Sequence, residues 1–333
     1  MVAKRAGVSR PTVSLVLNNR ATELGISTET QQRVLDVVRE LGYRRNELVR
    51  SVVTGKNRRL GFLAYNYTEH VLRLLAGAME EARKHGYVVE WHRLGGTRED
   101  HLKTIQGCVE QRLPGVMVVE VEDETLLGEF HQELARHSIP VAVMDSSFPH
   151  SWGVRVVSDD EEGSGQAVKH LAELGHRRIA FLAGDRVSGS SAQRERGYLR
   201  TMEALGLASR LERVDWNIQK TEEFVERMVS DRTPPTALIC ANDALALAAM
   251  RAARRCGLSC PEQLSVVGYA NLHLTDLSDP PLTTVEQPFE EIGKRTVCAL
   301  LERLENDCIS FDSPQEIRLP VRLIVRGSTA PPV

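Results

Sequence analysis

The sequence lacks the features of membrane, secreted and metal-dependent proteins. No apolar run among its 333 residues is long enough to span a bilayer, and its start has no secretory signal pattern. Its six cysteines are scattered, and no His or Cys cluster around the closest two, Cys256 and Cys260, completes a zinc site. We therefore expect reduced thiols in a cytoplasmic protein with no bound metal and no cofactor.

The sequence also lacks the motifs of common enzyme classes. It contains no G-x-x-x-x-G-K-S/T phosphate loop, no G-x-S-x-G nucleophile turn and no HExxH metal motif. Residues 163–166 (GSGQ) form an incomplete dinucleotide-binding fingerprint. We interpret the acidic run 159–162 as a solvated helix start rather than a metal site, because carboxylates favour a helix N-terminus. These absences argue against an enzyme.

A helix-turn-helix pattern occupies residues 3–19, AKRAGVSRPTVSLVLNN. A short helix runs into Gly7, and a second helix opens at Ser9, a preferred N-cap residue, with Pro11 in its first turn. Polar side chains lie on one side of the second helix and apolar ones on the other: Arg10, Thr12 and Ser14 against Val13, Val16 and Leu17. A helix that reads the major groove of DNA needs this arrangement.

The charge distribution agrees with a DNA-binding head. Residues 1–59 contain 12 Lys and Arg against 5 Asp and Glu, a net charge of +7, whereas the whole chain has 42 against 45. The rest of the chain therefore carries 30 basic and 40 acidic residues, a net charge of −10. A basic head on an acidic body is typical of a protein whose head contacts phosphates, and the alternative is a solvated basic surface without a partner.

The head is expected to contain a third helix and a connecting segment. Ser27 is a candidate N-cap for a helix that ends near Leu41 and Gly42, with apolar residues at helical spacing: Val34, Leu35, Val38 and Leu41. Residues 46–53 could form a short hinge helix before the linker-like TGKNRR. Two helical turns are marginal in water, so this helix would form only against DNA or a second copy, and the alternative is a flexible linker.

The rest of the chain alternates strands and helices, and 333 residues suggest two or three folding units. Strands are expected at 60–65, 87–92, 115–120, 139–145, 178–184, 236–243 and 264–271, with helices at 71–85, 100–111, 126–137, 163–174, 193–205 and 244–256. This order predicts two Rossmann-like lobes with parallel sheets and a cleft at their facing strand ends. An effector should then touch the strand-end loops: Tyr65, Asn66, Asp145, Asp185, Asn242, Asp243, Ala270 and Asn271.

Ordered motifs along the whole chain resemble the lactose-repressor/galactose-repressor family of bacterial transcription regulators. They are AKRAGVSRPTVSLVLN and STETQQRVLDVVRELGY in the head, and LAELGHRRIAFLAG, ANDALALAAMRAARRCGLSCPEQLSVVGY, PPLTTVEQP and VRLIVRGST in the body. The resemblance implies an all-α head on an α/β body like a periplasmic binding protein. It implies a homodimer or tetramer that binds double-stranded, pseudo-palindromic operator DNA and a small effector, often a sugar or a purine. A dimer is favoured because no heptad helix follows Thr329.

The resemblance also implies domain bounds and DNA contacts. The implied bounds are 1–44 for the head, 45–59 for the hinge and linker, 60–157 with 289–316 for the first lobe, and 158–288 with 317–330 for the second. Positions that match DNA contacts are Ser9, Arg10, Pro11, Thr12, Ser14, Leu15 and Asn18 in the head, and Asn46, Val49 and Val52 in the hinge. Arg10 is the candidate for bidentate pairing with guanine, whereas Thr12 and Ser14 suit phosphate or sugar. The hinge helix would enter the minor groove.

In the body, the resemblance implies effector contacts from Asp145, Arg194, Asn242, Gln287 and Phe289, besides the strand-end residues Tyr65, Asn66 and Asn271. The planar fork of Arg194 suits a carboxylate, a phosphate or a hydroxyl, and Asn242 can both donate and accept. The alternative for Arg194, Asp145 and Gln287 is a hydrogen bond that only stabilises a loop.

Several positions depart from the family pattern. Met1 and Val2 stand almost directly on the first helix; Leu15, Arg45 and Val52 replace the usual Arg, Pro and Leu; and Ala270 replaces an acid that binds sugar hydroxyls. Losing that carboxylate should weaken an ordinary sugar by about 1–3 kcal/mol. Our leading hypothesis is an effector-controlled repressor. The alternative is a solute-binding sensor with a weakened, N-terminally truncated head.

Overall fold

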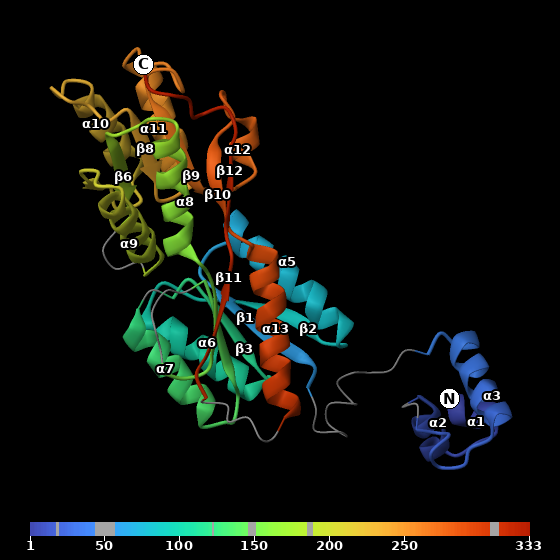
Figure 1. Cartoon of the computed structure of the whole chain (residues 1–333). Coiled ribbons are helices and arrows are strands. Elements are labelled where there is room, and N and C mark those ends of the chain that lie inside the picture. The colour runs from blue at the N-terminus through green and yellow to red at the C-terminus, as the bar shows by residue number, and fades with distance from the viewer. Residues whose placement is uncertain (18–19, 44–56, 122, 146–150, 185–188, 307–312) are drawn as a thin grey trace. The chain divides into compact units, whose positions relative to one another are not determined.

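The computed structural model describes residues 1–17, 20–43, 57–121, 123–145, 151–184, 189–306 and 313–333. The chain forms two compact units, Met1–Asn57 and Arg58–Val333, and each is described by itself. We refer to them as the head and the body (Figure 1). No described helix has the length and apolar content needed to cross a membrane.

The head contains three helices around a small apolar core: α1 (Val2–Ala6), α2 (Arg10–Leu17) and α3 (Thr28–Glu40). Gly7 ends α1 with a left-handed φ of 66°, which a residue without a Cβ adopts readily. Ser27 caps α3 as predicted, because its hydroxyl accepts a hydrogen bond from the Thr30 N–H. The core is filled by Val2, Ala6, Val13, Val16, Ala21, Val34 and Val37, with Leu35, Val38 and Leu41 packed against it. The predicted hinge helix lies outside the described residues.

The first lobe of the body is a six-stranded, all-parallel sheet in the order β11-β5-β4-β3-β1-β2. Its strands are β1 (Arg59–Ala64), β2 (Val88–Arg93), β3 (Val116–Val119), β4 (Val141–Met144), β5 (Val154–Ser158) and β11 (Gln315–Leu319). Its helices are α5 (Glu69–Lys84), α6 (Arg98–Glu110), α7 (Glu124–Ala135) and α13 (Phe289–Glu305). Because β11 pairs with β5 as far as Leu319, the predicted lobe boundary between residues 316 and 317 is wrong and cuts a strand.

The second lobe is a six-stranded sheet in the order β12-β10-β9-β8-β6-β7. Its strands are β6 (Ile179–Ala183), β7 (Arg210–Arg213), β8 (Ala237–Cys240), β9 (Ser265–Ala270), β10 (Thr283–Glu286) and β12 (Arg322–Ile324). Its helices are α8 (Asp160–Glu173), α9 (Gly189–Ala204), α10 (Ile218–Met228), α11 (Asp243–Arg255) and the short α12 (Leu274–Leu277). The edge strand β12 runs antiparallel to β10, so this sheet is not entirely parallel.

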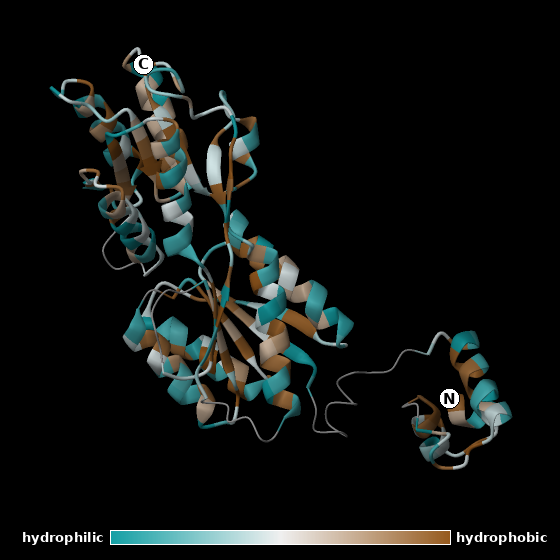
Figure 2. Cartoon of the chain, in the orientation of Figure 1, coloured by the Kyte–Doolittle hydropathy of each residue, from teal (hydrophilic) through white to brown (hydrophobic). Residues whose placement is uncertain are grey.

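The chain changes lobe after β5, after β10 and after β11, as the strand membership of the two sheets requires. Figure 2 shows hydrophobic residues concentrated in the strands of both lobes, and the helices carry hydrophilic residues outward. Parallel strands covered by helices are buried on both faces, which explains their continuous apolar sequences. The carboxyl ends of the strands are therefore the places where polar side chains can gather between the lobes.

Candidate functional site

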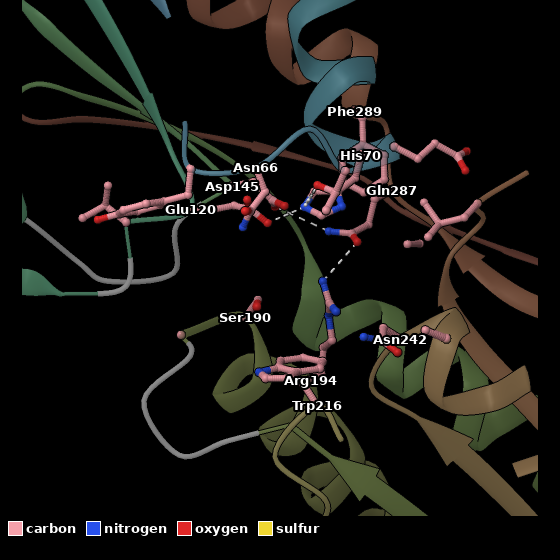
Figure 3. Close-up of a pocket in the computed structure, with 18 of the residues that line it drawn as sticks. Asn66, His70, Glu120, Asp145, Ser190, Arg194, Trp216, Asn242, Gln287 and Phe289 are labelled. Atoms are coloured by element: carbon pink, nitrogen blue, oxygen red, sulfur yellow. Dashed lines mark hydrogen bonds and ion pairs between the residues drawn. The ribbon is translucent and has the colours of Figure 1, made fainter. Parts of the chain in front are cut away.

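A cavity of about 750 Å³ lies between the two lobes of the body. Seven of the eight residues that the resemblance assigns to the effector line it, and so does the strand-end residue Ala270. The seven are Tyr65, Asn66, Asp145, Arg194, Asn242, Gln287 and Phe289. Figure 3 shows Asn66, His70, Glu120 and Asp145 gathered on one side, and Ser190, Arg194, Trp216 and Asn242 on the other. The first group belongs to the first lobe and the second group to the second lobe. The cavity therefore has one wall from each lobe.

Arg194 is the buried centre of the second-lobe wall and is only 6% exposed. Its Nε donates to Asp160 Oδ2 (3.0 Å), its Nη1 to the Ala241 carbonyl oxygen (2.6 Å) and its Nη2 to Gln287 Oε1 (3.0 Å). The guanidinium also lies over the ring of Tyr269, 4.0 Å from its centroid. Because a guanidinium has five N–H donors, two remain for a ligand.

Asp160 corrects our interpretation of the acidic run 159–162. The run does start helix α8, with Asp159 as its N-cap, but Asp160 is only 2% exposed instead of solvated. Its carboxylate pairs with Arg194 and also accepts hydrogen bonds from Ser158 Oγ (2.8 Å) and Tyr269 Oη (3.1 Å). A buried charge pair with this many additional partners holds Arg194 in one orientation.

Gln287 joins this network to the first lobe where the chain crosses from β10 to α13. Its Nε2 donates to Ser158 Oγ (2.7 Å), to Asp160 Oδ1 (3.3 Å) and, at 3.5 Å, to Asp145 Oδ1. Its Oε1 is taken by Arg194. Gln287 is 1% exposed, so its polar atoms are almost entirely occupied by the protein. We therefore assign it to positioning Arg194 and Asp145.

The side chain of Asn242 lines the cavity, but part of its hydrogen-bonding capacity is used by the protein. Its side-chain oxygen caps helix α11 by accepting the Leu245 N–H (2.8 Å). Its NH₂ group and the second lone pair of the oxygen remain, so the cap takes one of the acceptor positions with which Asn242 could bind a ligand.

Asn271 and Asp243 do not line the cavity, and both predictions are wrong. The Asn271 amide donates to Glu286 Oε1 (2.9 Å) and accepts from Arg326 Nη2 (2.8 Å). Asp243 is 1% exposed and accepts from the Leu272 N–H and the Thr284 hydroxyl. Both follow a strand end, but their side chains bond residues of β10 and neighbouring segments instead of lining the cavity. Asp185 lies outside the described residues.

Asp145 and Glu120 follow neighbouring strands, β4 and β3, and have left-handed backbones with φ of 50° and 56°. Such conformations cost energy for non-glycine residues and are concentrated at functional sites. Burial, reinforced by the charge of Asp160, raises the pKa of Asp145 to about 6. The fold therefore keeps this carboxyl in the cavity wall although burying its ionised form costs free energy.

Glu120 also contacts His70, at the start of helix α5, through Oε1 and Nε2 at 2.5 Å. Burial lowers the pKa of His70, but the hydrogen bond and charge of Glu120 outweigh it and raise the pKa overall. The second carboxylate oxygen, Glu120 Oε2, is buried and has no hydrogen-bond partner among the described residues. A buried acceptor without a partner costs free energy, which a hydrogen-bond donor on a ligand would recover.

Aromatic side chains complete the cavity: Tyr65 and Phe289 from the first lobe, and Trp216 from the second. Phe289 is buried and packs beneath the Arg73 guanidinium (5.2 Å to the ring centroid) and His70. Trp216 packs on Gly184, where a Cβ would come within 2.2 Å of its indole ring. Gly184 thus lets the indole lie flat beside the end of β6, where it offers an apolar surface to a ligand.

Residues that the sequence reasoning did not assign to the effector also line the cavity, among them Thr68, Glu69, His70, Glu120, Asp123, Ser190 and Trp216. Glu120 could have been found, because it ends the predicted strand 115–120 and the strand-end rule applies to it. Trp216 follows the edge strand β7, which was not predicted, so no pattern in the sequence identified it. Among the described residues no group of His, Cys, Asp and Glu is arranged to hold a metal ion.

In the head, α2 presents the predicted contact side. Ser9, Arg10, Pro11 and Ser14 are exposed, Thr12 and Leu15 are half-buried, and Val13 and Val16 are buried in the core. Ser9 accepts a hydrogen bond from the Thr12 N–H (3.2 Å), as an N-cap does. Four further predicted DNA contacts lie outside the described residues: Asn18, Asn46, Val49 and Val52.

Comparison with known proteins identifies both parts of the chain. Residues 2–46 match the family described as bacterial regulatory proteins, lacI family, and residues 168–329 match a periplasmic binding protein-like domain. The chain is 31% identical over 312 residues to the HTH-type transcriptional repressor PurR of Aliivibrio salmonicida, covering 92% of this chain and 91% of that protein. It is 31% identical over 337 residues to the HTH-type transcriptional regulator DegA of Bacillus subtilis, covering 99% and 97%.

Solved structures agree over nearly the full length. A lac repressor dimer bound to operator and the anti-inducer ONPF has a TM-score of 0.85 and 27% identity, covering 99% of this chain and 98% of that one. A complex of the transcriptional regulator CelR with cellobiose has a TM-score of 0.73 and 25% identity, covering 98% of each chain.

Proposed function

This chain belongs to the lacI family of bacterial regulatory proteins, and we propose that it is a repressor that binds a pseudo-palindromic operator as a homodimer. The chain is a DNA-binding transcriptional regulator rather than an enzyme. The repressor assignment is supported by the likeness to PurR, and the dimer by the likeness to the lac repressor dimer on its operator. We place its action in the bacterial cytoplasm, on the nucleoid.

We propose that α2 reads the operator through Arg10, with Ser9, Thr12 and Ser14 toward the backbone. The exposed face of α2 and the buried Val13 and Val16 support this orientation.

We propose that the effector is a sugar or sugar derivative held between the two lobe walls. The observation that carries this proposal is Arg194, buried and fixed by Asp160, Gln287 and Ala241, yet lining the cavity with two donors left over. Hydroxyl groups suit these donors, the Asn242 NH₂ group and the Asp145 carboxylate, and the flat face of Trp216 suits a ring.

Effector binding would then control DNA binding by linkage. A ligand that touches both walls favours one relative placement of the lobes over another, and operator affinity changes by the same factor as effector affinity. The closing contacts come from different lobes, with Asp145 on one side and Arg194 and Asn242 on the other.

The first test is selection of binding sites from a random duplex library by the purified protein at low and moderate salt. We expect enrichment of a palindrome of about 14–20 base pairs with steep salt dependence. The enriched duplex then serves to screen sugars and their derivatives for release of the protein. Absence of enrichment at both salt concentrations would contradict the repressor assignment.

The effector site itself is tested by Asn242→Ser. Serine keeps the cap on α11 but removes the NH₂ group, so we expect about tenfold weaker effector binding with little change in thermal stability. The matched control is Asn217→Ser, because Asn217 caps α10 in the same way but does not line the cavity. Equal effects of the two substitutions on effector affinity would exclude the proposed contact.

A further inference from the structure

We propose that the effector carries a protonated amine, as an amino sugar does, and that the first-lobe wall of the cavity binds this amine through Glu120 and Asp145. This inference rests on the proposed effector site and narrows its ligand to one chemical class. It is carried by the distribution of charge over the two walls and by the hydrogen bonds that the charged groups lack.

The two walls differ in charge. Four carboxylates line the cavity, and all of them lie on the first lobe: Glu69, Glu120, Asp123 and Asp145. Among the described lining residues, the only guanidinium or ammonium group is that of Arg194, on the second lobe. A ligand that spans the cavity therefore meets an acidic surface at one end and a hydrogen-bonding, aromatic surface at the other.

The positive charge of Arg194 does not balance the first-lobe wall. Its Nε contacts Asp160 at 3.0 Å, and Asp160 is 2% exposed and does not line the cavity. The two buried charges form a pair within the second-lobe wall. Among the described lining residues, His70 is the one other group that can carry a positive charge, and it contacts Glu120, so the carboxylate of Asp145 has no cation in direct contact.

Two of the four carboxylates already serve the fold. Glu69 Oε1 accepts the His273 N–H (2.8 Å), and Asp123 Oδ1 caps helix α7 through the Leu126 N–H (3.0 Å). Glu120 and Asp145 are less fully used, because Glu120 Oε2 has no hydrogen-bond partner among the described residues and Asp145 has a single side-chain contact there, at 3.5 Å. These two follow adjacent strands, so a single cationic group can reach both.

Glu120 has an acceptor that the described residues leave unpaired. His70 occupies Oε1, whereas Oε2 is buried without a partner among them. An ammonium group supplies several N–H donors together with the charge that a desolvated carboxylate favours. A protonated His70 offsets the charge of Glu120 and acts on Asp145 through space, but it gives no hydrogen bond to Glu120 Oε2 or to Asp145 among the contacts of the described residues.

Asp145 has only one side-chain partner among the described residues, the Gln287 amide at the long distance of 3.5 Å. A hydroxyl would supply a hydrogen bond but would not relieve the concentration of negative charge that Asp145 shares with Glu120 and Asp160. An anionic ligand such as a sugar phosphate would increase it. A ligand amine supplies the hydrogen bond and also relieves the negative charge. It can do so while the sugar ring lies against Trp216.

This inference is tested by measuring how tightly the full chain binds ligands that have been separated by their charge. A bacterial metabolite extract is separated into cationic, neutral and anionic fractions, and each is tested for raising the melting temperature and for changing operator binding. We expect the activity in the cationic fraction. The active amine and its N-acetylated form, which has the same ring but no charge, are then compared by calorimetry, with at least about tenfold tighter binding of the amine.

Three variants test whether the preference for the amine over its N-acetylated form depends on the first-lobe wall. Glu120→Gln and Asp145→Asn should each weaken the amine about tenfold while changing the N-acetylated form less than about twofold. Glu124→Gln, which removes an exposed charge from α7 outside the cavity, should change neither.

The failures are distinguishable. Activity in the neutral or anionic fraction, abolished by Asn242→Ser, would overturn the amine and leave the effector site intact. Activity in no fraction would overturn both the amine and the proposed effector control, even where operator binding persists. Equal binding of the amine and its N-acetylated form would also overturn the inference.

Discussion

Single residues in the cavity lower the stability of the fold and at the same time favour ligand binding. Asp145 is held as a buried carboxyl near Asp160 and Glu120, and its pKa is raised to about 6 by burial and by these charges. The left-handed backbone of Asp145 and Glu120 and the positive φ of Ala270 (117°) also cost the folded protein energy. Asp145 and Glu120 follow strand ends and Ala270 is the last residue of β9, and at these places contacts to a ligand can compensate for the energy that the strained backbone costs.

We expect Asp145→Asn to stabilise the protein without effector above pH 6. A carboxyl whose pKa is raised from 3.8 to about 6 binds its proton more tightly in the folded state, so the native chain loses stability as the pH rises through that interval. Asparagine removes this loss, which is about 3 kcal/mol.

Thermal melts between pH 4 and 8 measure the effect. The stability difference between variant and native chain should grow from near zero at pH 4 to a plateau above pH 6. Asp243, whose pKa burial also raises to about 6, is present in both proteins and cancels. A difference that is constant over the whole range would contradict the assignment.

Arg10 is the residue on which sequence preference should depend. We expect Arg10→Ala to lower operator affinity by about 1–3 kcal/mol and to relax preference at one base pair of each half-site, because Arg pairs bidentately with guanine. Repeated library selection measures both quantities. Arg39→Ala on α3, an exposed Arg paired with Asp36, is the control and should leave preference unchanged.

At the scale of elements, the contact between α5 and α13 explains why glycines interrupt two amphipathic helices. A Cβ on Gly77 would lie 1.9 Å from the Glu290 carbonyl oxygen, and one on Gly293 would lie 2.1 Å from that of Leu74. The two helices cross at backbone contact. The periodicity of the sequence predicted α5, but it could not indicate that a later helix approaches it so closely.

Gly77→Ala should therefore destabilise the body by about 1–3 kcal/mol, because neither backbone can move without disturbing the packing. Gly107→Ala is the matched control: Gly107 lies in α6 with no atom within 4 Å of the place that an alanine methyl group would take, and it should gain about 0.5–1 kcal/mol from helix propensity. Denaturant unfolding measures both. A stabilised Gly77→Ala protein would refute the close contact.

At the scale of the whole body, Arg73 connects the lobes. Its Nε and Nη2 pair with both oxygens of Glu290 on α13 (2.7 and 3.0 Å), while Nη1 donates to the Asn271 carbonyl oxygen, just beyond β9 of the second lobe (3.2 Å). Asn271 follows Ala270, which lines the cavity. Arg73 thus lies where a ligand-dependent movement of β9 would reach the first lobe.

We expect Arg73→Met to change effector affinity although Arg73 does not line the cavity, and to change the effector's influence on operator affinity reciprocally. A change of about threefold to tenfold in each is the expected size for a lost polar contact between lobes. Titrations of effector with and without operator give both values. An unchanged coupling factor would restrict Arg73 to a structural role.

The sequence by itself determined the helix-turn-helix head, the alternation of strands and helices over much of the body, and the strand-end residues of the cavity lining. Local rules suffice there, because caps, apolar periodicity and the position of a residue at a strand end depend on neighbours in the chain. Five strands escaped them: the internal strands β5 and β10 and the edge strands β7, β11 and β12. Of the edge strands, β7 (RLER) is half-buried and charged, and β12 has three residues and runs antiparallel.

Only the tertiary structure decided what each polar group in the cavity binds. Asp160 and Arg194 are 34 positions apart, and Arg194 and Gln287 are 93 apart, so no local pattern could pair them. The side chain of Asn271 bonds Glu286 of β10 and Arg326, whereas Glu120 keeps a buried oxygen without a partner among the described residues. Burial and long-range contacts, rather than residue type, separate a residue that holds the cavity together from one that can bind a ligand.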